Sequence, residues 1–153
     1  MEKTIIVELL DRPEFIPTAV RWIRKEWPDS RDDSAIEDRL CGSRRRDTLP
    51  LALVAVLGST PIGFVSLTLY ENGIKRGRPH WIDALYVEPA YRGQGIARQL
   101  VHAAEEKSVV LGLTELFALT EIPRLYHKCG WNTVEEFTTP NGRDFIVARR
   151  LAD

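Results

Sequence analysis

The sequence is poor in the residues that build disulfide frameworks, zinc sites and membrane spans. Its two cysteines, Cys41 and Cys129, are too few for a disulfide framework. No apolar run approaches the roughly 18 residues that a transmembrane helix needs. The cysteines and the three histidines also lack the spacing of zinc ligands, so we predict that the protein binds no metal.

An excess of charge of one sign is also lacking. The chain has 21 Lys and Arg residues against 22 Asp and Glu residues, a formal net charge of −1. This balance gives no electrostatic reason to expect nucleic acid or a membrane as a partner. The segment Met1-Glu2-Lys3-Thr4 lacks a signal-peptide pattern. Together with the low cysteine content, it leads us to expect a cytoplasmic protein.

What is present fits one globular domain over residues 1–153. The chain is 44% hydrophobic and 28% charged, which is typical of a soluble domain of this length. Apolar periodicity and turn residues predict the order strand, two helices, three strands, helix, strand, helix, two strands. We expect the first helix to start at Asp11-Arg12-Pro13 with Asp11 as its N-cap. We expect the second to start at Ser34, which has capping-box spacing to Glu37. The pattern alone predicts a mixed α/β domain around a central sheet.

The most informative segment is 87–100, where a predicted strand leads through a glycine-containing loop into a helix. The first N–H groups of a helix have no intrahelical partner, and the helix dipole adds positive potential there. Gly93 and Gly95 let the main chain approach a ligand closely, while Arg92 and Arg98 add forked donors. The segment therefore predicts a phosphate or pyrophosphate site. It lacks the third glycine of the Rossmann fingerprint and the Gly-Lys-Ser/Thr of the P-loop.

Arg92, Gly95 and Ala97 form the pattern Arg-x-x-Gly-x-Ala. This resembles the acetyl-CoA signature of the GNAT superfamily of N-acetyltransferases, in particular its bacterial-type single-domain members. Two flanking segments resemble the family at the expected separation, Leu85-Tyr86-Val87-Glu88-Pro89 and Leu125-Tyr126-His127-Lys128-Cys129-Gly130-Trp131. The resemblance implies a GNAT fold, classed as α/β or, in some schemes, α+β. Such a fold has a central mixed sheet of about seven strands, splayed between strands four and five, with about four helices.

The resemblance further implies acetyl-CoA as the acetyl donor and no metal. The main chain of one strand would pair with the pantetheine arm and polarise the thioester carbonyl, and the loop with the following helix start would hold the pyrophosphate. The cofactor-binding residues implied in this way are Leu85, Tyr86, Val87, Arg92, Gly93, Gln94, Gly95, Ile96, Ala97, Arg98 and Tyr126.

Two residues are the candidates for proton transfer. The resemblance places Tyr126 next to the donor's sulfur as a general acid, because a phenol with a pKa near ~10 keeps its proton at neutral pH. Asp83 is the candidate general base, since an acid within an apolar strand is unusual and some relatives carry a catalytic Glu or His on this strand. Strand alternation predicts that Asp83, Leu85 and Val87 point to one face. Asp83 would take the amine proton directly or through a water, or bind the ammonium; His80 is the runner-up.

In the family, the first two helices and the segment between them shape the acceptor pocket. Here we expect Glu26 and Trp27 to bind substrate, because a carboxylate and an aromatic face both favour a cationic amine. The predicted reaction is transfer of the acetyl group to a primary amine by direct attack in a ternary complex. The acceptor would be a small molecule or a protein amine, and the enzyme a monomer or homodimer. The alternatives left open are a non-catalytic acyl-CoA-binding sensor or subunit and a phosphate-binding structural domain.

Overall fold

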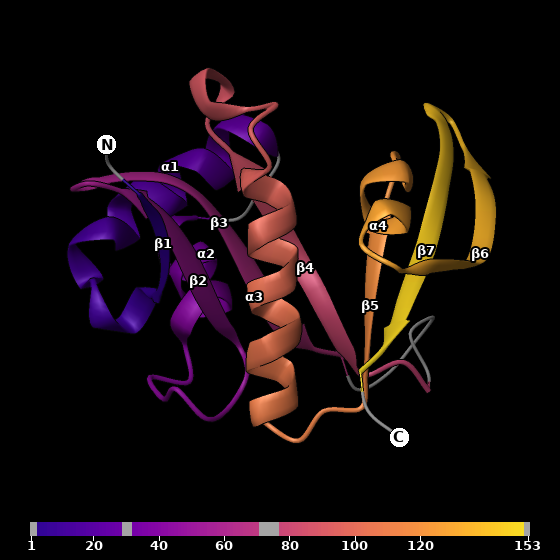
Figure 1. Cartoon of the computed structure of the whole chain (residues 1–153), viewed down its shortest axis with the longest axis horizontal. Coiled ribbons are helices and arrows are strands. Elements are labelled where there is room, and N and C mark those ends of the chain that lie inside the picture. The colour runs from indigo at the N-terminus through magenta and orange to yellow at the C-terminus, as the bar shows by residue number, and fades with distance from the viewer. Residues whose placement is uncertain (1–2, 29–31, 71–76, 152–153) are drawn as a thin grey trace.

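A computed structural model of the chain describes residues 3–28, 32–70 and 77–151. In these residues seven strands form one mixed sheet with the order β1-β2-β3-β4-β5-β7-β6, accompanied by four α-helices (Figure 1). The order of elements along the chain is the predicted one. Apart from short 3-10 turns, the elements are β1 (Thr4–Glu8), α1 (Ile16–Glu26), α2 (Asp33–Cys41), β2 (Leu51–Leu57), β3 (Thr60–Leu69), β4 (His80–Val87), α3 (Ile96–Val110), β5 (Glu115–Thr120), α4 (Arg124–Lys128), β6 (Asn132–Thr139) and β7 (Gly142–Arg150).

Two hydrophobic clusters cover the two faces of the sheet. On one face Leu100 and Val101 of α3 pack with Val65 of β3, and on the other Trp22 of α1 packs with Phe64. Neighbouring residues of β3 thus belong to opposite cores, which explains why β2 and β3 read as continuous apolar runs. No helix within the described residues is long and apolar enough to cross a membrane.

The first helix starts later than the sequence predicted. Two 3-10 turns, Leu9–Asp11 and Pro13–Phe15, precede α1, which begins at Ile16 with Pro17 in its first turn. Proline has no N–H to donate and is tolerated in that turn, so an α-helix that began near Asp11 would have placed Pro17 in its interior. Asp11 as the N-cap was therefore wrong.

The second helix is capped by a different residue from the one predicted. Asp32 has extended backbone angles, and its side chain accepts a hydrogen bond from the Ala35 N–H at 2.9 Å. This is the usual geometry of an N-cap. The prediction of Ser34 as the start was wrong because Asp32 supplies the cap two residues earlier, and α2 then runs from Asp33 to Cys41.

The sheet splays between its fourth and fifth strands, as predicted. β4 and β5 pair in parallel where Trp81 meets Phe117 and Ile82 meets Ala118, and no later residues of the two strands pair. β5 instead keeps its pairing with β7 over its whole length. Figure 1 shows β4 and β5 side by side at one end and diverging toward the end where α3 begins. The later part of β4 therefore keeps one main-chain edge that β5 does not cover.

A bulge in β4 changes the direction of one candidate side chain. The residues before and after Asp83 pair with consecutive residues of β3, 67 and 66, so Asp83 is extra in the ladder. Leu85 and Val87 pack in the core on the α3 face, whereas Asp83 contacts Arg39 of α2 on the opposite face. The prediction that Asp83, Leu85 and Val87 share a face was wrong, because alternation does not hold across a bulge.

Candidate active site

The loop between β4 and α3 exposes its main chain. Gly93 and Gly95 have φ angles of +79° and +83°, and Gly95 is the N-cap of α3 without any side-chain cap. A Cβ atom built on either glycine would meet no atom within 4 Å. The N–H groups of the first helical turn therefore adjoin open space, and an anionic ligand can approach them closely.

A cleft of about 470 Å³ lies at this helix start; we call it the α3 cleft. One wall is the part of β4 that β5 leaves uncovered, and α1 and the segment around α4 complete it. The lining residues are Glu26, Leu85, Tyr86, Val87, Tyr91, Arg92, Gly93, Gly95, Ile96, Ala97, Arg98, Ile122 and Leu125. The structure thus brings together all the predicted cofactor residues except Gln94 and Tyr126, which do not line this cleft.

Arg92 is held against the wall of the α3 cleft. Its Nε donates a hydrogen bond to the Val87 carbonyl at 2.8 Å, and its guanidinium carbon lies 5.5 Å from the centre of the Tyr86 ring. These contacts place a fixed positive charge beside the start of α3. Amide donors, a helix dipole and guanidinium groups together suit a diphosphate, so these residues fit the CoA moiety that the sequence motif implies.

A second cavity, of about 700 Å³, adjoins the first; we call it the acidic cavity. It shares Glu26, Leu85, Ile122 and Leu125 with the α3 cleft. Its other lining residues are Trp27, Ile82, Asp83, Ala84, Leu119, Thr120, Glu121, Tyr126 and Asp144. Of these thirteen lining residues, which all belong to the part of the chain that the structure describes, four are carboxylates and none is Lys, Arg or His. The predicted catalytic and substrate residues therefore all line this cavity, while Glu121 and Asp144 had no distinguishing signal in the sequence.

Tyr126 lies on α4 with 5% of its surface exposed. Its ring packs against Trp131, with the ring centres 5.0 Å apart. Burial raises the pKa of Tyr126 above the ordinary value of 10.0. The hydroxyl therefore keeps its proton at neutral pH and can act as a hydrogen-bond donor.

Asp83 already has two partners inside the protein. Its carboxylate accepts hydrogen bonds from Arg39 Nε at 3.1 Å, from Arg39 Nη2 at 2.7 Å and from the Tyr70 hydroxyl at 2.8 Å. A carboxylate has about four lone-pair sites, so Asp83 can accept one more hydrogen bond from a ligand. Burial, and then Asp83, raise the pKa of Tyr70, which remains a donor. Arg39 lies 44 residues away on another element, and no feature of the sequence indicated this pairing.

His80, the runner-up for the base, lines neither cavity. Burial lowers its pKa below the ordinary value of 6.5, so the ring is neutral at pH 7. Within the described residues, no group of three or more His, Cys, Asp or Glu side chains is arranged to hold a metal ion.

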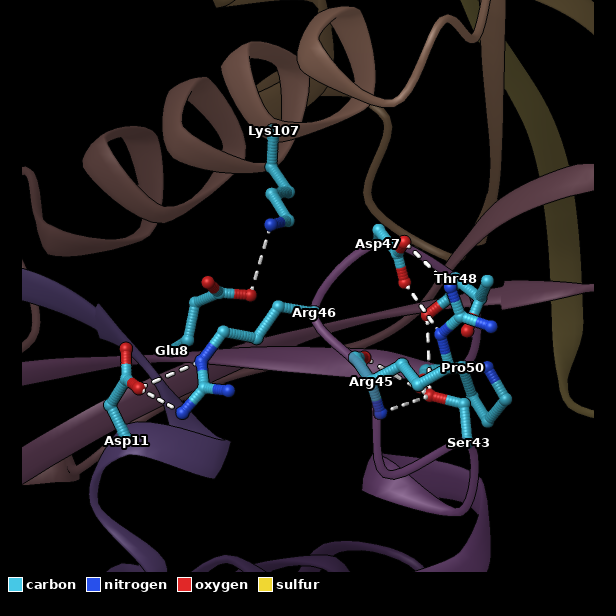
Figure 2. Close-up of polar contacts among 9 residues, drawn as sticks. All are labelled: Glu8, Asp11, Ser43, Arg45, Arg46, Asp47, Thr48, Pro50 and Lys107. Carbon is cyan, nitrogen blue, oxygen red and sulfur yellow. Dashed lines mark hydrogen bonds and ion pairs between the residues drawn. The ribbon is translucent and has the colours of Figure 1, made fainter.

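The densest run of positive charge, Arg44–Arg46, lies outside both cavities. Figure 2 shows Arg45 bound to Asp47 within the loop between α2 and β2, and Arg46 bound to Asp11. Arg44 pairs with Glu37 at 3.0 Å. All three arginines are therefore neutralised locally. Arg45 and Arg46 lie near Lys107, in the C-terminal half of α3 and far along that helix from its start.

A family model agrees with this geometry. Residues 13–131, most of the chain, match the acetyltransferase (GNAT) family. The chain belongs to the GNAT acetyltransferase family. Its seven-stranded mixed sheet with parallel β4–β5 pairing and four helices is the GNAT fold. No curated protein matches this GNAT chain.

Solved structures share the fold at low sequence identity. A chain of the NatC complex, crystallised with Gag peptide and CoA, is 21% identical with a TM-score of 0.77, and the match covers 98% of this chain and 99% of that one. An aminoglycoside 6'-N-acetyltransferase in complex with coenzyme A is 20% identical, with a TM-score of 0.76 and coverage of 97% and 98%. The ribosomal-protein-S18-alanine N-acetyltransferase of Escherichia coli is 15% identical, with a TM-score of 0.70 and coverage of 99% and 96%. At these identities the likeness shows the fold, and the acceptors of these GNAT proteins differ widely.

Proposed function

We propose that this protein is an acetyl-CoA-dependent N-acetyltransferase that acetylates a primary amine by direct attack in a ternary complex. The observation that carries the proposal is the junction of two cavities of opposite character at the splayed strands. The α3 cleft offers amides and arginines to an anionic donor, and the adjoining acidic cavity offers carboxylates to a cationic acceptor. A donor and an acceptor bound in them would meet beside Leu85.

The α3 cleft supplies the binding of the donor. The first amides of α3 and the guanidinium groups of Arg92 and Arg98 bind the pyrophosphate. The uncovered main chain of Leu85 to Val87 pairs with the pantetheine amides and directs an N–H at the thioester carbonyl, as in an oxyanion hole. Bound acetyl-CoA supplies an acetyl group activated as a thioester.

The acidic cavity supplies the proton transfers. The bound ammonium group first loses one proton to solvent, and the neutral nitrogen then forms the new C–N bond while the C–S bond breaks and its electron pair stays on sulfur. Tyr126 donates its hydroxyl proton, or a full hydrogen bond, to that sulfur. Asp83 accepts the proton that the amine nitrogen loses, directly or through a water, at the lone pair that Arg39 and Tyr70 leave available.

Direct transfer is favoured over an acyl-enzyme by the state of Cys129, the cysteine near Tyr126. Burial raises the pKa of the Cys129 thiol. A nucleophilic cysteine needs a lowered pKa, because the thiolate is the reactive form. Cys129 therefore lacks the property that a covalent route through it requires.

The test is to incubate the protein with acetyl-CoA and a panel of primary amines and to follow thiol release. Initial rates over a grid of both substrates should give intersecting lines for a ternary complex. Parallel lines would contradict direct transfer. Binding of acetyl-CoA without thiol release for any amine would favour a sensor or subunit. No binding at millimolar acetyl-CoA would overturn the proposal.

A further inference from the structure

The proposed reaction leaves the class of amine open, and the acidic cavity narrows it. We propose that the cavity binds a compact acceptor that carries two or more ammonium groups, in the manner of an aliphatic diamine or polyamine. One nitrogen reacts at the junction of the two cavities, and the carboxylates farther from the junction hold the other. The inference rests on the proposed function, since it takes the acidic cavity as the acceptor site.

The charge of the cavity is unbalanced. Its carboxylates come from four parts of the fold: α1 for Glu26, β4 for Asp83, the β5–α4 segment for Glu121 and β7 for Asp144. Arg39 neutralises Asp83. Glu26, Glu121 and Asp144 form no ion pair with any residue that the structure describes. Three carboxylates that have no ion-pair partner among the described residues, around one space, favour a ligand with more than one positive charge.

The polar group at the reacting end independently points to a ligand. Tyr126 lines the cavity and is more than nine-tenths buried. Its hydroxyl has no hydrogen-bond partner among the residues that the structure describes, and it is not one of the fully enclosed unpaired atoms, which are the hydroxyls of Tyr86 and Ser108, so it opens onto the cavity. A ligand in the cavity beside α4 can therefore contact this hydroxyl, and because the hydroxyl is also proposed to meet the donor's sulfur, the reacting end of the acceptor lies near Tyr126.

The positions of the carboxylates separate the two ends of the acceptor. Glu26 lines both cavities and so lies at the junction, whereas Glu121 and Asp144 line the acidic cavity alone. A reacting nitrogen near Tyr126 and Glu26 leaves a second ammonium group to bind at Glu121 and Asp144. Trp27, with 42% of its surface exposed, adds an aromatic face that attracts cations.

The size and charge of the cavity favour a small molecule over the end of a protein. A volume of about 700 Å³ is within the range of small-molecule sites. A protein N-terminus brings a single ammonium group followed by neutral main chain. It would leave two of the three unpaired carboxylates in the cavity without a cation.

The inference is tested with 1,4-diaminobutane and butylamine, which have the same carbon chain and differ by one amino group. Calorimetric titration into the CoA-bound protein gives the ratio of their affinities, and thiol release from acetyl-CoA gives the ratio of their kcat/KM values. We expect both ratios to favour the diamine by about tenfold or more, which corresponds to about 1.4 kcal/mol for the additional ion pairing. Asp144→Asn and Glu121→Gln should each reduce the ratio, and the double variant should bring it close to one.

The matched control is Glu106→Gln, which removes an exposed carboxylate of α3 that pairs with His102 outside both cavities. It should leave the ratio unchanged. Equal affinity for the two amines, or a ratio that Asp144→Asn and Glu121→Gln leave intact, would overturn the inference. So would a tenfold preference for a peptide N-terminus over the diamine. Because the titration does not require turnover, failed acetyl transfer with intact diamine binding would count against the proposed function alone.

Discussion

The two cavities that meet at the splayed strands are built in different ways. The α3 cleft comes largely from one continuous segment of chain, residues 85–98, and it offers main-chain amides and two arginines. The acidic cavity is assembled from side chains on α1, β4, β5, α4 and β7. The first depends on backbone geometry and tolerates many side chains; the second depends on individual side chains. One fold can therefore keep its donor while its acceptor changes.

Tyr126 tests most directly whether the donor and acceptor sites are separate. It lines the acidic cavity but is proposed to act on the donor's sulfur. Tyr126→Phe keeps the ring against Trp131 and removes the one hydroxyl. We expect kcat to fall by about 100-fold or more, the cost of losing one preorganised donor in the transition state. Binding of CoA, measured by calorimetry, should change little. A large loss of CoA affinity with unchanged kcat would place Tyr126 in the donor site instead.

Substitution of Asp83 should affect the reaction of the amine acceptor and leave the binding of acetyl-CoA unchanged. Asp83→Asn keeps the shape of the side chain, and we expect kcat/KM for the amine to fall by about 100-fold if a general base is lost. Arg39→Gln removes the ion pair but keeps the carboxylate, so it should retain most of the kcat/KM that Asp83→Asn loses. If the two variants behave alike, Asp83 serves the structure of the cavity rather than proton transfer.

Substitution of Gly95 should affect only the binding of the donor. Gly112, at the other end of α3, provides a matched control. Gly95 and Gly112 flank the two ends of α3 with the same φ of +83°, and a Cβ on either would meet nothing within 4 Å. Alanine at either site carries a similar backbone strain. Only Gly95→Ala should weaken CoA binding, by about tenfold, because its Cβ would occupy the space beside the main chain and hold the diphosphate away from one amide, and a charge-assisted hydrogen bond contributes about 1.5–3 kcal/mol. Equal CoA affinity in Gly95→Ala and Gly112→Ala would remove the main-chain basis of the donor site.

The burial of Tyr126 should also affect the stability of the fold at alkaline pH, and this effect is smaller than the effects on catalysis and CoA binding above. Its folded-state pKa is raised, so above about pH 10 the unfolded chain releases this proton before the folded one does. The free energy of unfolding therefore decreases as the pH rises above about 10. Denaturant unfolding from pH 8 to pH 11 should show a smaller decline for Tyr126→Phe than for the wild-type protein. Identical declines would show that the phenol ionises equally in both states.

The difference in how the two cavities are built also explains which parts of the site could be predicted from the sequence. The end of β4, the glycine loop and the start of α3 were predicted from the sequence, because strand, glycine loop and helix start are local features. The cap at Asp32 was missed because two acceptable caps lie within three residues of each other. The orientation of Asp83 was missed because a bulge depends on the pairing of two strands. Glu121 and Asp144 were missed because they lie 23 residues apart. Nothing in the sequence around either residue indicates that both line the same cavity.

The smallest expected effect is at Arg46, which tests whether charge outside the two cavities matters. Arg46 and Asp11 are each about half exposed, and solvent screening makes such pairs weak. Arg46→Gln should leave the KM values for acetyl-CoA and for the amine unchanged and the unfolding midpoint within experimental error. Arg92→Gln, at the wall of the α3 cleft, should raise the KM for acetyl-CoA by about tenfold through loss of a charged donor. If Arg46→Gln had the same effect as Arg92→Gln, the donor's phosphates would reach the loop drawn in Figure 2, and the donor site could no longer be ascribed to one continuous segment.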